Sequence, residues 1–168
     1  MDVLLNDDER LIRESAREFL EGECSPKVVR AMEEDALGYP PKLWEKAAEL
    51  GWQGMCLPEH VGGSNMPLVY LGLVLGEVGR AVAPLPLHST AVASLAIARD
   101  GSEAQQKAYL PPVVAGKSVL TWAFNEQDPR FVPEAIRMQA RAQGDQFVLD
   151  GVKLFVDNFA VADHCLVV

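Results

Sequence analysis

Apolar residues recur with the spacing of an amphipathic helix over the first two thirds of the chain, from Asn6 to about Lys117. In residues 6–23, one face of the predicted helix carries Leu11, Ile12, Ser15, Ala16, Phe19 and Leu20. Asn6 is suited to cap this helix, because its side chain can accept a hydrogen bond from a free N–H of the first turn. The acidic residues that follow suit the positive end of the helix dipole. The pattern therefore predicts an amphipathic first helix.

Local start and stop signals predict further helices in the same part of the chain. Residues 25–35 open with Ser25 as a capping residue and Pro26 at the first helical position, where the missing N–H of proline costs nothing. Residues 40–51 repeat this design and end at Gly51. These signals predict that the chain begins as a set of short helices.

One predicted helix is far more apolar than the others. Residues 67–84 carry apolar side chains on nearly every side, which is typical of a central, buried helix. Gly72 and Gly76 within it would let a neighbouring helix approach closely. Two more helices are predicted over residues 89–101 and 102–110, the second of them opened by a capping box.

Beyond Gly116 the pattern changes to short segments rich in β-branched and aromatic residues, separated by Gly, Asp and Asn. The predicted strands lie in residues 118–124, 135–142, 146–158 and 163–168. Gly144 and Asp145 predict a hairpin turn. The sequence therefore predicts an α+β chain, with an all-helical domain over residues 1–117 and an incomplete antiparallel β-domain over residues 118–168. Because the last predicted strand is apolar, we expect a partner or further chain to cover its edge.

The composition is ordinary for a folded protein, with 49% apolar and 23% charged residues in 168. The net charge of -9 argues against nucleic-acid binding, because phosphates would be repelled, and against an anionic membrane surface. The N-terminal residues are acidic and polar, unlike a secretory leader. The apolar residues 66–76 are too few to span a bilayer. These features predict a cytoplasmic protein.

The cysteines and histidines do not show the spacing of metal ligands. They are Cys24, Cys56, Cys165, His60, His88 and His164. We expect buried free thiols, structural histidines and no metal.

Three motifs, in this order along the chain, carry a resemblance to a known family. They are "LPEHVGG" at residues 57–63, "GSEAQQKAYLPPVVAGK" at residues 101–117 and "LDGVKLFVDNFAVADHCLVV" at residues 149–168. Each alone is explained by turns and helix caps, but together they resemble the acyl-CoA dehydrogenase family over essentially the whole chain. The resemblance implies a subunit with an N-terminal helical domain, a middle β-domain and a C-terminal helical domain.

The resemblance also implies a chemistry. Acyl-CoA dehydrogenases use FAD to introduce a double bond between Cα and Cβ of an acyl-CoA thioester, in fatty acid or lipid metabolism. A carboxylate removes the α-proton, and the β-hydrogen leaves as hydride to the flavin. In the family this carboxylate lies in the C-terminal helical domain, so no catalytic residue is assigned here. The isolated chain is expected to be inactive, and an electron-transfer flavoprotein is a possible acceptor.

The family's flavin-edge strand normally reads Ala-x-Thr-Glu-Pro-x-x-Gly-Ser-Asp. By this resemblance, Trp122, Phe124 and Asn125 are the cofactor-binding candidates, and Asn125 stands at the threonine position, where its amide can still donate. The Gly-Ser-Asp turn is replaced by "DPRF" at residues 128–131, which removes a place of close backbone approach. We therefore expect an altered flavin edge.

A second flavin-contacting strand, Trp-Ile-Thr in the family, becomes Phe155, Val156 and Asp157. A carboxylate about 4 Å from a reduced, anionic flavin would cost roughly 4 kcal/mol at an effective dielectric constant of 20. Arg130 is either the compensating cation, near substrate and cofactor, or a solvated loop residue.

Ser89 and Thr90 are the other substrate-binding candidates, because they stand where the family lines its acyl tunnel, although ordinary helix packing also explains them. Two functions follow from the altered edge. One is a FAD-dependent acyl-CoA dehydrogenase-like subunit. The other is a non-catalytic partner in a hetero-oligomer, because divergent, small-subunit-like members assemble with a second polypeptide of the family. A homo-oligomer is equally compatible with the sequence.

Overall fold

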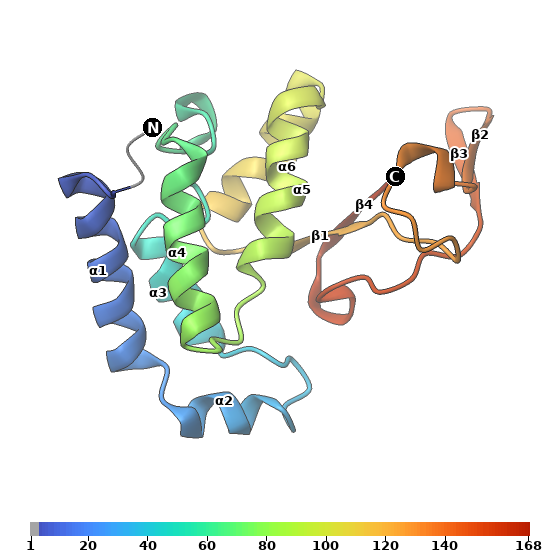
Figure 1. Ribbon diagram of the computed structural model, residues 1–168. Coiled ribbons are helices and arrows are strands. Elements are labelled where there is room, and N and C mark those ends of the chain that lie inside the picture. The colour runs from blue at the N-terminus through green and yellow to red at the C-terminus, as the bar shows by residue number, and fades with distance from the viewer. Residues whose placement is uncertain (1–3) are drawn as a thin grey trace.

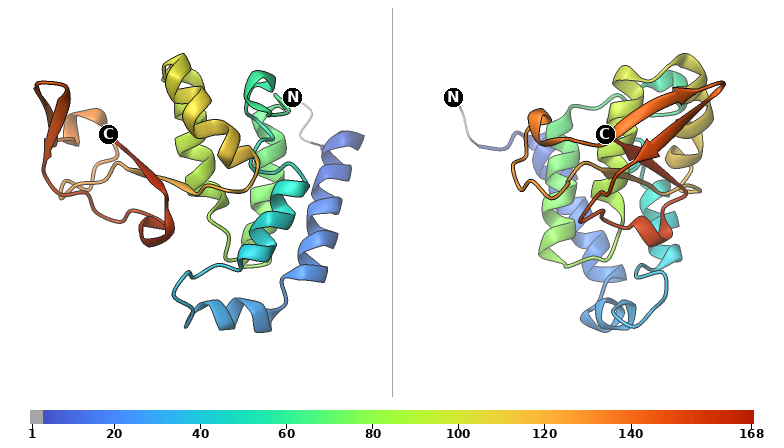
Figure 2. Two further views of the ribbon diagram at one scale, coloured as in Figure 1. Left: turned by 180° about the vertical axis from the view of Figure 1, so that it is seen from behind. Right: turned by 90° about the vertical axis from the view of Figure 1, so that its right-hand side faces the viewer.

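The computed structural model describes residues 4–168 and divides them into a bundle of helices and a smaller β-region (Figure 1). The helices are α1 (Asp7–Glu23), α2 (Pro26–Met32), α3 (Pro41–Glu49), α4 (Leu68–Arg80), α5 (Leu87–Asp100) and α6 (Glu103–Val114). Short 3-10 helices cover Glu59–Val61, Pro133–Ala135 and Phe159–Val161. Helix α2 lies across one end of the bundle, and the β-region lies on the side away from α1 (Figure 2).

The predicted helix caps are confirmed. The Asn6 side chain accepts a hydrogen bond from the Glu9 amide and the Glu9 side chain accepts one from the Asn6 amide, so both orphan donors are satisfied. Ser102 and Gln105 form the same reciprocal pair at the start of α6. The predicted buried face of α1 was too wide, because Leu11 is 67% exposed. Ser15 is exposed too.

The sequence predicted that the apolar helix α4 is buried on nearly every side. In the structure, one face of α4 is exposed. Leu71, Val74 and Glu77 face the interior, whereas Leu68 is 63% exposed. A Cβ added at Gly76 would meet no atom within 4 Å, so no described element covers the glycine face of this helix. The prediction was wrong because a helix with apolar residues on nearly every side gives little sign of which face is covered, and its acidic residue Glu77 is itself buried.

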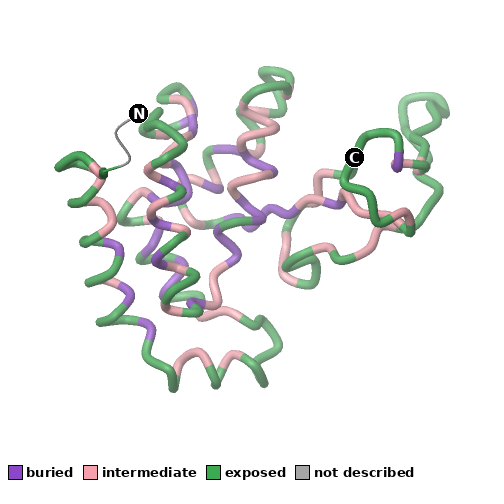
Figure 3. Tube along the Cα trace, in the orientation of Figure 1, coloured by how far each residue is buried: buried purple, intermediate pink, exposed green. Residues whose placement is uncertain are grey.

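The main hydrophobic core lies between the helices. Its buried members are Ala16, Leu20, Cys24, Leu43, Trp44, Ala47, Trp52, Leu71, Val74, Ala83, Leu87 and Val119. An edge-to-face contact between Phe19 and Trp52, with ring centroids 5.2 Å apart, closes this core against α1. Buried positions run through the helices and into β1, whereas the hairpin is exposed (Figure 3).

The β-region contains two separate strand pairs. Strands β2 (Gln139–Gln143) and β3 (Gln146–Asp150) form the expected antiparallel hairpin, in which Gly144 takes a φ of 62° at the turn. Strands β1 (Leu120–Ala123) and β4 (His164–Val167) pair in parallel, where the sequence predicted an antiparallel domain. The prediction erred because a strand pattern does not reveal the direction of a partner some 40 residues away.

Strand β1 packs on the helical bundle rather than standing free. The Thr90 hydroxyl of α5 donates to the Leu120 carbonyl over 3.1 Å and accepts from the Leu120 amide over 3.2 Å. Leu120 is 1% exposed and packs with Ala93 and Val113. Strand β1 is therefore fixed both to the helical bundle and to the β-region. The domain boundary between residues 117 and 118, just before this strand, stays a prediction.

Candidate functional site at the edge of strand β1

An aromatic cluster marks the end of β1, where the sequence predicted a flavin edge. Alternate residues of a strand point to the same face, so Leu120, Trp122 and Phe124 share one face. Leu120 is buried against the helices, but Trp122 and Phe124 are only partly covered. The ring of Phe131 completes the cluster, with centroids 4.4 Å from Phe124 and 6.0 Å from Trp122. Phe131 is 65% exposed, so the cluster offers an apolar surface to its surroundings.

The loop that carries Phe131 is closed by a single carboxylate. Glu126 follows β1, and its two oxygens accept hydrogen bonds from the backbone amides of Arg137 over 2.8 Å and Met138 over 2.9 Å. The two ends of the loop over residues 127–136 therefore meet at one side chain. This loop includes the "DPRF" segment that stands in place of a Gly-Ser-Asp turn.

A nearly buried lysine neutralises Glu126. The Lys153 ammonium lies 2.8 Å from Glu126 Oε1 and also donates to the Phe124 carbonyl over 3.2 Å. The two charged side chains are 6% and 10% exposed. The Lys153 hydrogen bond, followed by the Met138 amide, lowers the pKa of Glu126 to about 2, so the carboxylate stays ionised.

Arg130 is paired with its neighbour in the loop. Its guanidinium bonds both carboxylate oxygens of Asp128, the shortest contact being 2.6 Å. This pairing lowers the pKa of Asp128 to about 2. Of the two predictions for Arg130, the loop ion pair describes its contacts in this structure, and a role beside substrate stays a prediction.

Asn125 lies two residues beyond the end of β1, with its backbone carbonyl engaged and its side-chain amide available. Its carbonyl accepts a hydrogen bond from the Leu154 amide over 2.8 Å. Its half-buried side-chain amide makes no hydrogen bond to residues 4–168. The amide donor that the sequence predicted for this position is therefore available to a ligand.

Residues 155–157 do not form the predicted second strand. Strand β3 ends at Asp150, and Phe155 takes a positive φ of 53° with its side chain 87% exposed. The Asp157 backbone carbonyl accepts a hydrogen bond from the Thr121 hydroxyl, while its side chain is exposed. A "β-branched and aromatic" pattern was misleading here because Gly151 starts an irregular segment. Val156 lines a pocket on the other side of β1.

Ser89 and Thr90 are both 1% exposed and bonded within the protein. Ser89 donates to the Pro86 carbonyl and accepts from the Asn158 side-chain amide over 3.0 Å. Thr90 holds Leu120, as described above. These contacts support the packing interpretation of both hydroxyls, and their role in substrate binding stays a prediction.

The family model described as "Acyl-CoA dehydrogenase, N-terminal domain" matches residues 6–117. The chain belongs to the acyl-CoA dehydrogenase family. It is 31% identical, over 95% of its length and 39% of the relative's, to cyclohex-1-ene-1-carbonyl-CoA dehydrogenase from Syntrophus aciditrophicus. It thus spans about two fifths of that relative.

Solved structures of the family have the same fold. One, named "Tcur3481-Tcur3483 steroid ACAD G363A variant", is 35% identical with a TM-score of 0.85, covering 96% of this chain and 44% of that one. The ChsE4-ChsE5 complex from Mycobacterium tuberculosis, at 24% identity and a TM-score of 0.86, covers 98% and 44% and shows the fold alone. The predicted family and fold class are confirmed.

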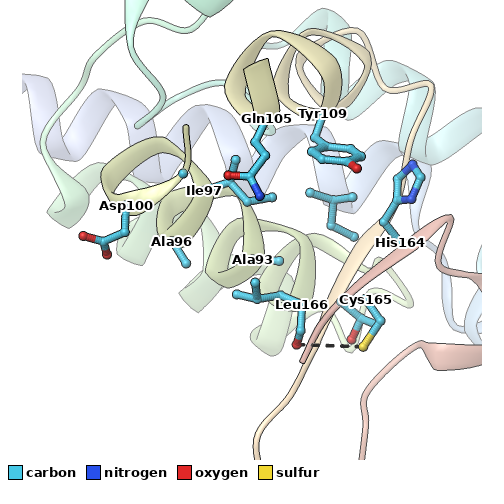
Figure 4. A pocket seen from close by; sticks show the side chains of 12 residues that line it. Ala93, Ala96, Ile97, Asp100, Gln105, Tyr109, His164, Cys165 and Leu166 are labelled. Atoms are coloured by element: carbon cyan, nitrogen blue, oxygen red, sulfur yellow. Dashed lines mark hydrogen bonds between the residues drawn. The ribbon is translucent and has the colours of Figure 1, made fainter. Parts of the chain in front are cut away.

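The structure of this acyl-CoA dehydrogenase family chain also contains a cleft that sequence reasoning missed (Figure 4). It holds about 530 Å³ between α5, α6 and the β1–β4 pair. Ala93 and Ala96 form part of its apolar wall, and the Tyr109 ring packs on His164 with centroids 4.9 Å apart. The i, i+3 spacing of small residues on α5 was the available signal. His164 has an aromatic partner here, which agrees with a structural role.

Glu126 and Lys153 were missed as well, although Lys153 stands in the third family motif and Glu126 in the altered flavin-edge segment. Their pairing was not visible because 27 positions separate them. Among residues 4–168 no group of three or more metal-ligating side chains occurs, and no helix is long and apolar enough to cross a membrane. The cysteines are free in this structure, with Cys24 buried and the other two half-buried.

Proposed function

We propose that this chain is part of a FAD-dependent acyl-CoA dehydrogenase that desaturates an acyl-CoA thioester between Cα and Cβ. Membership of the family supports this proposal. The observation that carries it is the end of β1, where an aromatic face and an unengaged Asn125 amide meet at the position of the family's flavin-edge motif. Flat apolar surface and a single hydrogen-bond donor suit a planar heterocycle with polar edges.

The residues present fit a flavin on one side and oppose it on the other. The flavin, when bound, would accept the β-hydrogen as hydride. Trp122 and Phe124 would contact its ring, and Asn125 would donate to a ring acceptor. Asp157, which is exposed, would oppose the negative charge of a reduced flavin if it lay nearby. Its exposure also leaves it free for water or for a cation from another chain.

A non-catalytic role in a hetero-oligomer is the second candidate, and one observation favours it. The segment that replaces the Gly-Ser-Asp turn is closed by the Asp128–Arg130 ion pair and by Phe131 packed on Phe124. The backbone there is not free to wrap a ligand as a glycine turn would be. In this case a second polypeptide of the family would supply the complete site.

The proposed ligand and location follow the same reasoning. The substrate would be an acyl-CoA, and the relatives named above make alicyclic and steroid acyl groups sensible members of a test panel beside straight and branched chains. An electron-transfer flavoprotein is the proposed acceptor, and the cytoplasm the proposed location. The proposed assembly is an oligomer of acyl-CoA dehydrogenase-type subunits.

Size-exclusion chromatography of the native gene product, recording protein and flavin absorbance together, tests this function. We expect flavin to coelute with a dimer or larger species. Coeluting flavin and dye reduction by any acyl-CoA of the panel would establish the catalytic proposal. Coeluting flavin without turnover, or a colourless species that gains turnover when a second family subunit is added, would favour the partner role. A colourless protein that is inactive with every partner would contradict both.

The 168-residue chain on its own is expected to reduce no electron-transfer dye with any acyl-CoA, because in this family the carboxylate that removes the α-proton lies in the C-terminal helical domain. The pKa values of Glu126 and Asp128 are lowered to about 2 by Lys153 and Arg130, which makes both carboxylates weak proton acceptors. A steady-state dye assay with the same acyl-CoA panel measures this, and turnover above the buffer rate would contradict the expectation.

A further inference from the structure

One ammonium group connects three parts of the candidate site. Lys153 lies in the irregular segment after β3, far along the chain from β1. It bonds the Phe124 carbonyl at the end of β1 and the Glu126 carboxylate that closes the loop over residues 127–136. The backbone of one cluster ring and the loop that carries another are therefore fixed by the same charged group.

The burial of this pair makes it sensitive to change. Lys153 and Glu126 are 6% and 10% exposed, and the carboxylate also accepts two backbone amides. Removing one partner of a buried ion pair leaves an uncompensated charge, which is strongly unfavourable. The pair of Lys107 and Glu103 on α6 offers a contrast, because its contact of 2.6 Å joins side chains that are 69% and 81% exposed.

Apart from the Asp128–Arg130 ion pair within its own loop, the position of Phe131 has little other support. Its ring is 65% exposed, and its ring contacts are to Phe124 and Trp122. An exposed aromatic side chain on a loop gains little from burial, so its placement depends on where the ends of the loop are held. Those ends are held at Glu126.

We propose that Lys153 is a positioning residue, which acts through Glu126 and Phe124 to hold Trp122, Phe124 and Phe131 as one binding face. This inference rests on the proposed function, because the ligand of that face is taken to be the flavin. In this proposal Lys153 does not contact the ligand itself, but it sets the shape of the aromatic surface that binds the ligand. Loss of the ammonium releases the loop and separates the three rings.

The first test follows Trp122 by ¹⁹F NMR in protein labelled with 5-fluorotryptophan. The chain has three tryptophans, Trp44 and Trp52 in the helical core and Trp122 in the cluster, and Trp122→Phe assigns the last resonance. In Lys153→Met the Trp122 resonance is expected to move or broaden, while the two core resonances keep their positions and report that the protein is folded. Lys107→Met, which removes the exposed pair, is the matched control and is expected to change none of the three.

The second test titrates FAD into the same variants and follows flavin fluorescence. Lys153→Met is expected to weaken FAD binding by roughly tenfold or more. The buried Glu126 carboxylate loses its partner, so the loop is released and the three rings no longer form one binding face. Lys107→Met is expected to change it by less than about twofold, because exposed pairs contribute little. Lys153→Arg keeps the positive charge and is expected to recover most of the binding and the Trp122 resonance.

The outcomes separate this inference from the proposed function. If the wild-type chain binds no FAD, the proposed cofactor role fails for this chain, while the ¹⁹F experiment still decides whether Lys153 organises the cluster. If Lys153→Met leaves the Trp122 resonance and the FAD affinity unchanged, the inference is overturned. A Trp122 change without any change in FAD affinity also overturns it, because the pair would then be structural alone. If Lys153→Met loses all three resonances, Lys153→Arg and Glu126→Gln are compared by the same two readouts, and the inference requires that Glu126→Gln weakens FAD binding more than Lys153→Arg does.

Discussion

The helical bundle and the β-region keep their shape by different means. In the bundle, Leu20, Val74 and Leu87 are fully buried, and the helices are ordered around them. In the hairpin of β2 and β3, every residue of both strands is exposed, and Phe147 is 71% exposed. The β-region holds its irregular segments largely through polar contacts, above all the Glu126–Lys153 pair. Shape in one region comes from apolar burial, and in the other from a few charged groups.

Each region nevertheless contains one carboxylate that organises its surroundings. Glu77 of α4 is 4% exposed and accepts hydrogen bonds from Arg17 of α1 and Arg80 of its own helix. Glu126 does the same for the loop after β1. The two carboxylates differ in the apolar packing around them. Glu77 lies beside the main hydrophobic core, whereas few buried apolar side chains surround Glu126. A lost ion pair is therefore expected to matter more for local shape in the β-region.

Among the variants that test this difference between the two regions, removal of a core side chain is expected to change the free energy of unfolding most. Leu20→Ala is expected to lower the free energy of unfolding by about 2–5 kcal/mol, because it leaves a cavity between α1 and the core. Urea unfolding followed by far-ultraviolet circular dichroism measures it. Leu11→Ala on the same helix, where the side chain is 67% exposed, is the control and is expected to change stability by less than about 0.5 kcal/mol. Equal losses in the two variants would contradict the described packing of α1.

The acid dependence of stability tests Glu77. The Arg17 and Arg80 hydrogen bonds, with the first the larger, lower the pKa of Glu77 to about 2. A carboxyl whose pKa is lower in the folded protein stabilises it above the unfolded pKa, and this stabilisation is lost as pH falls toward 2. Glu77→Gln is expected to cost about 1.5–3 kcal/mol near pH 7 and to show a weaker decline between about pH 4.5 and 2. Urea midpoints across this range measure both.

The same midpoints provide the check on Glu77. An unchanged acid decline in Glu77→Gln would show that other carboxyls govern it. Glu103→Gln in the exposed pair of α6 is the matched control, and it is expected to leave both the neutral stability and the acid decline close to those of the wild type.

A substitution on the uncovered face of α4 is expected to change the free energy of unfolding least, and to raise it. Gly76→Ala is expected to raise stability by about 0.5–1 kcal/mol, because alanine favours the helix and its Cβ meets no described atom within 4 Å. Gly116→Ala is the contrast, since Gly116 has a φ of 67° and an added Cβ would lie 2.6 Å from Ala48 Cβ, so a loss is expected. A loss in Gly76→Ala that grows with protein concentration would show that a second chain covers this face.

Sequence reasoning predicted the local features of the fold well, because they depend on neighbouring residues. The Asn6 and Ser102 caps and the turn at Gly144 are each decided within four positions. It failed for the exposed face of α4 and for the parallel pairing of β1 with β4, because both depend on contacts between distant segments. The family itself was predictable because its turns and caps recur in order.

The strand that carries the candidate site was predictable from the sequence, but the contacts of its residues were not. Asn125 stands at the end of β1 as expected, with its amide available. The strand predicted at Phe155 is absent, since Gly151 begins an irregular segment, and Arg130 turns to Asp128. Lys153 was overlooked because a lysine in a motif is usually exposed, and its burial follows from a carboxylate far away in the sequence.

The parallel pairing of β1 and β4 has a consequence for the newly made chain. Leu120 can join the helical core as soon as α5 and α6 have formed, but its strand then has a free edge until residues 164–167 are made. At synthesis rates of roughly 5–20 residues per second, the intervening 40 or so residues take about 2–8 s. During that time an apolar strand with open hydrogen-bonding groups is exposed to other nascent chains. Slower translation over residues 124–163 would lengthen the time for which this edge stays open.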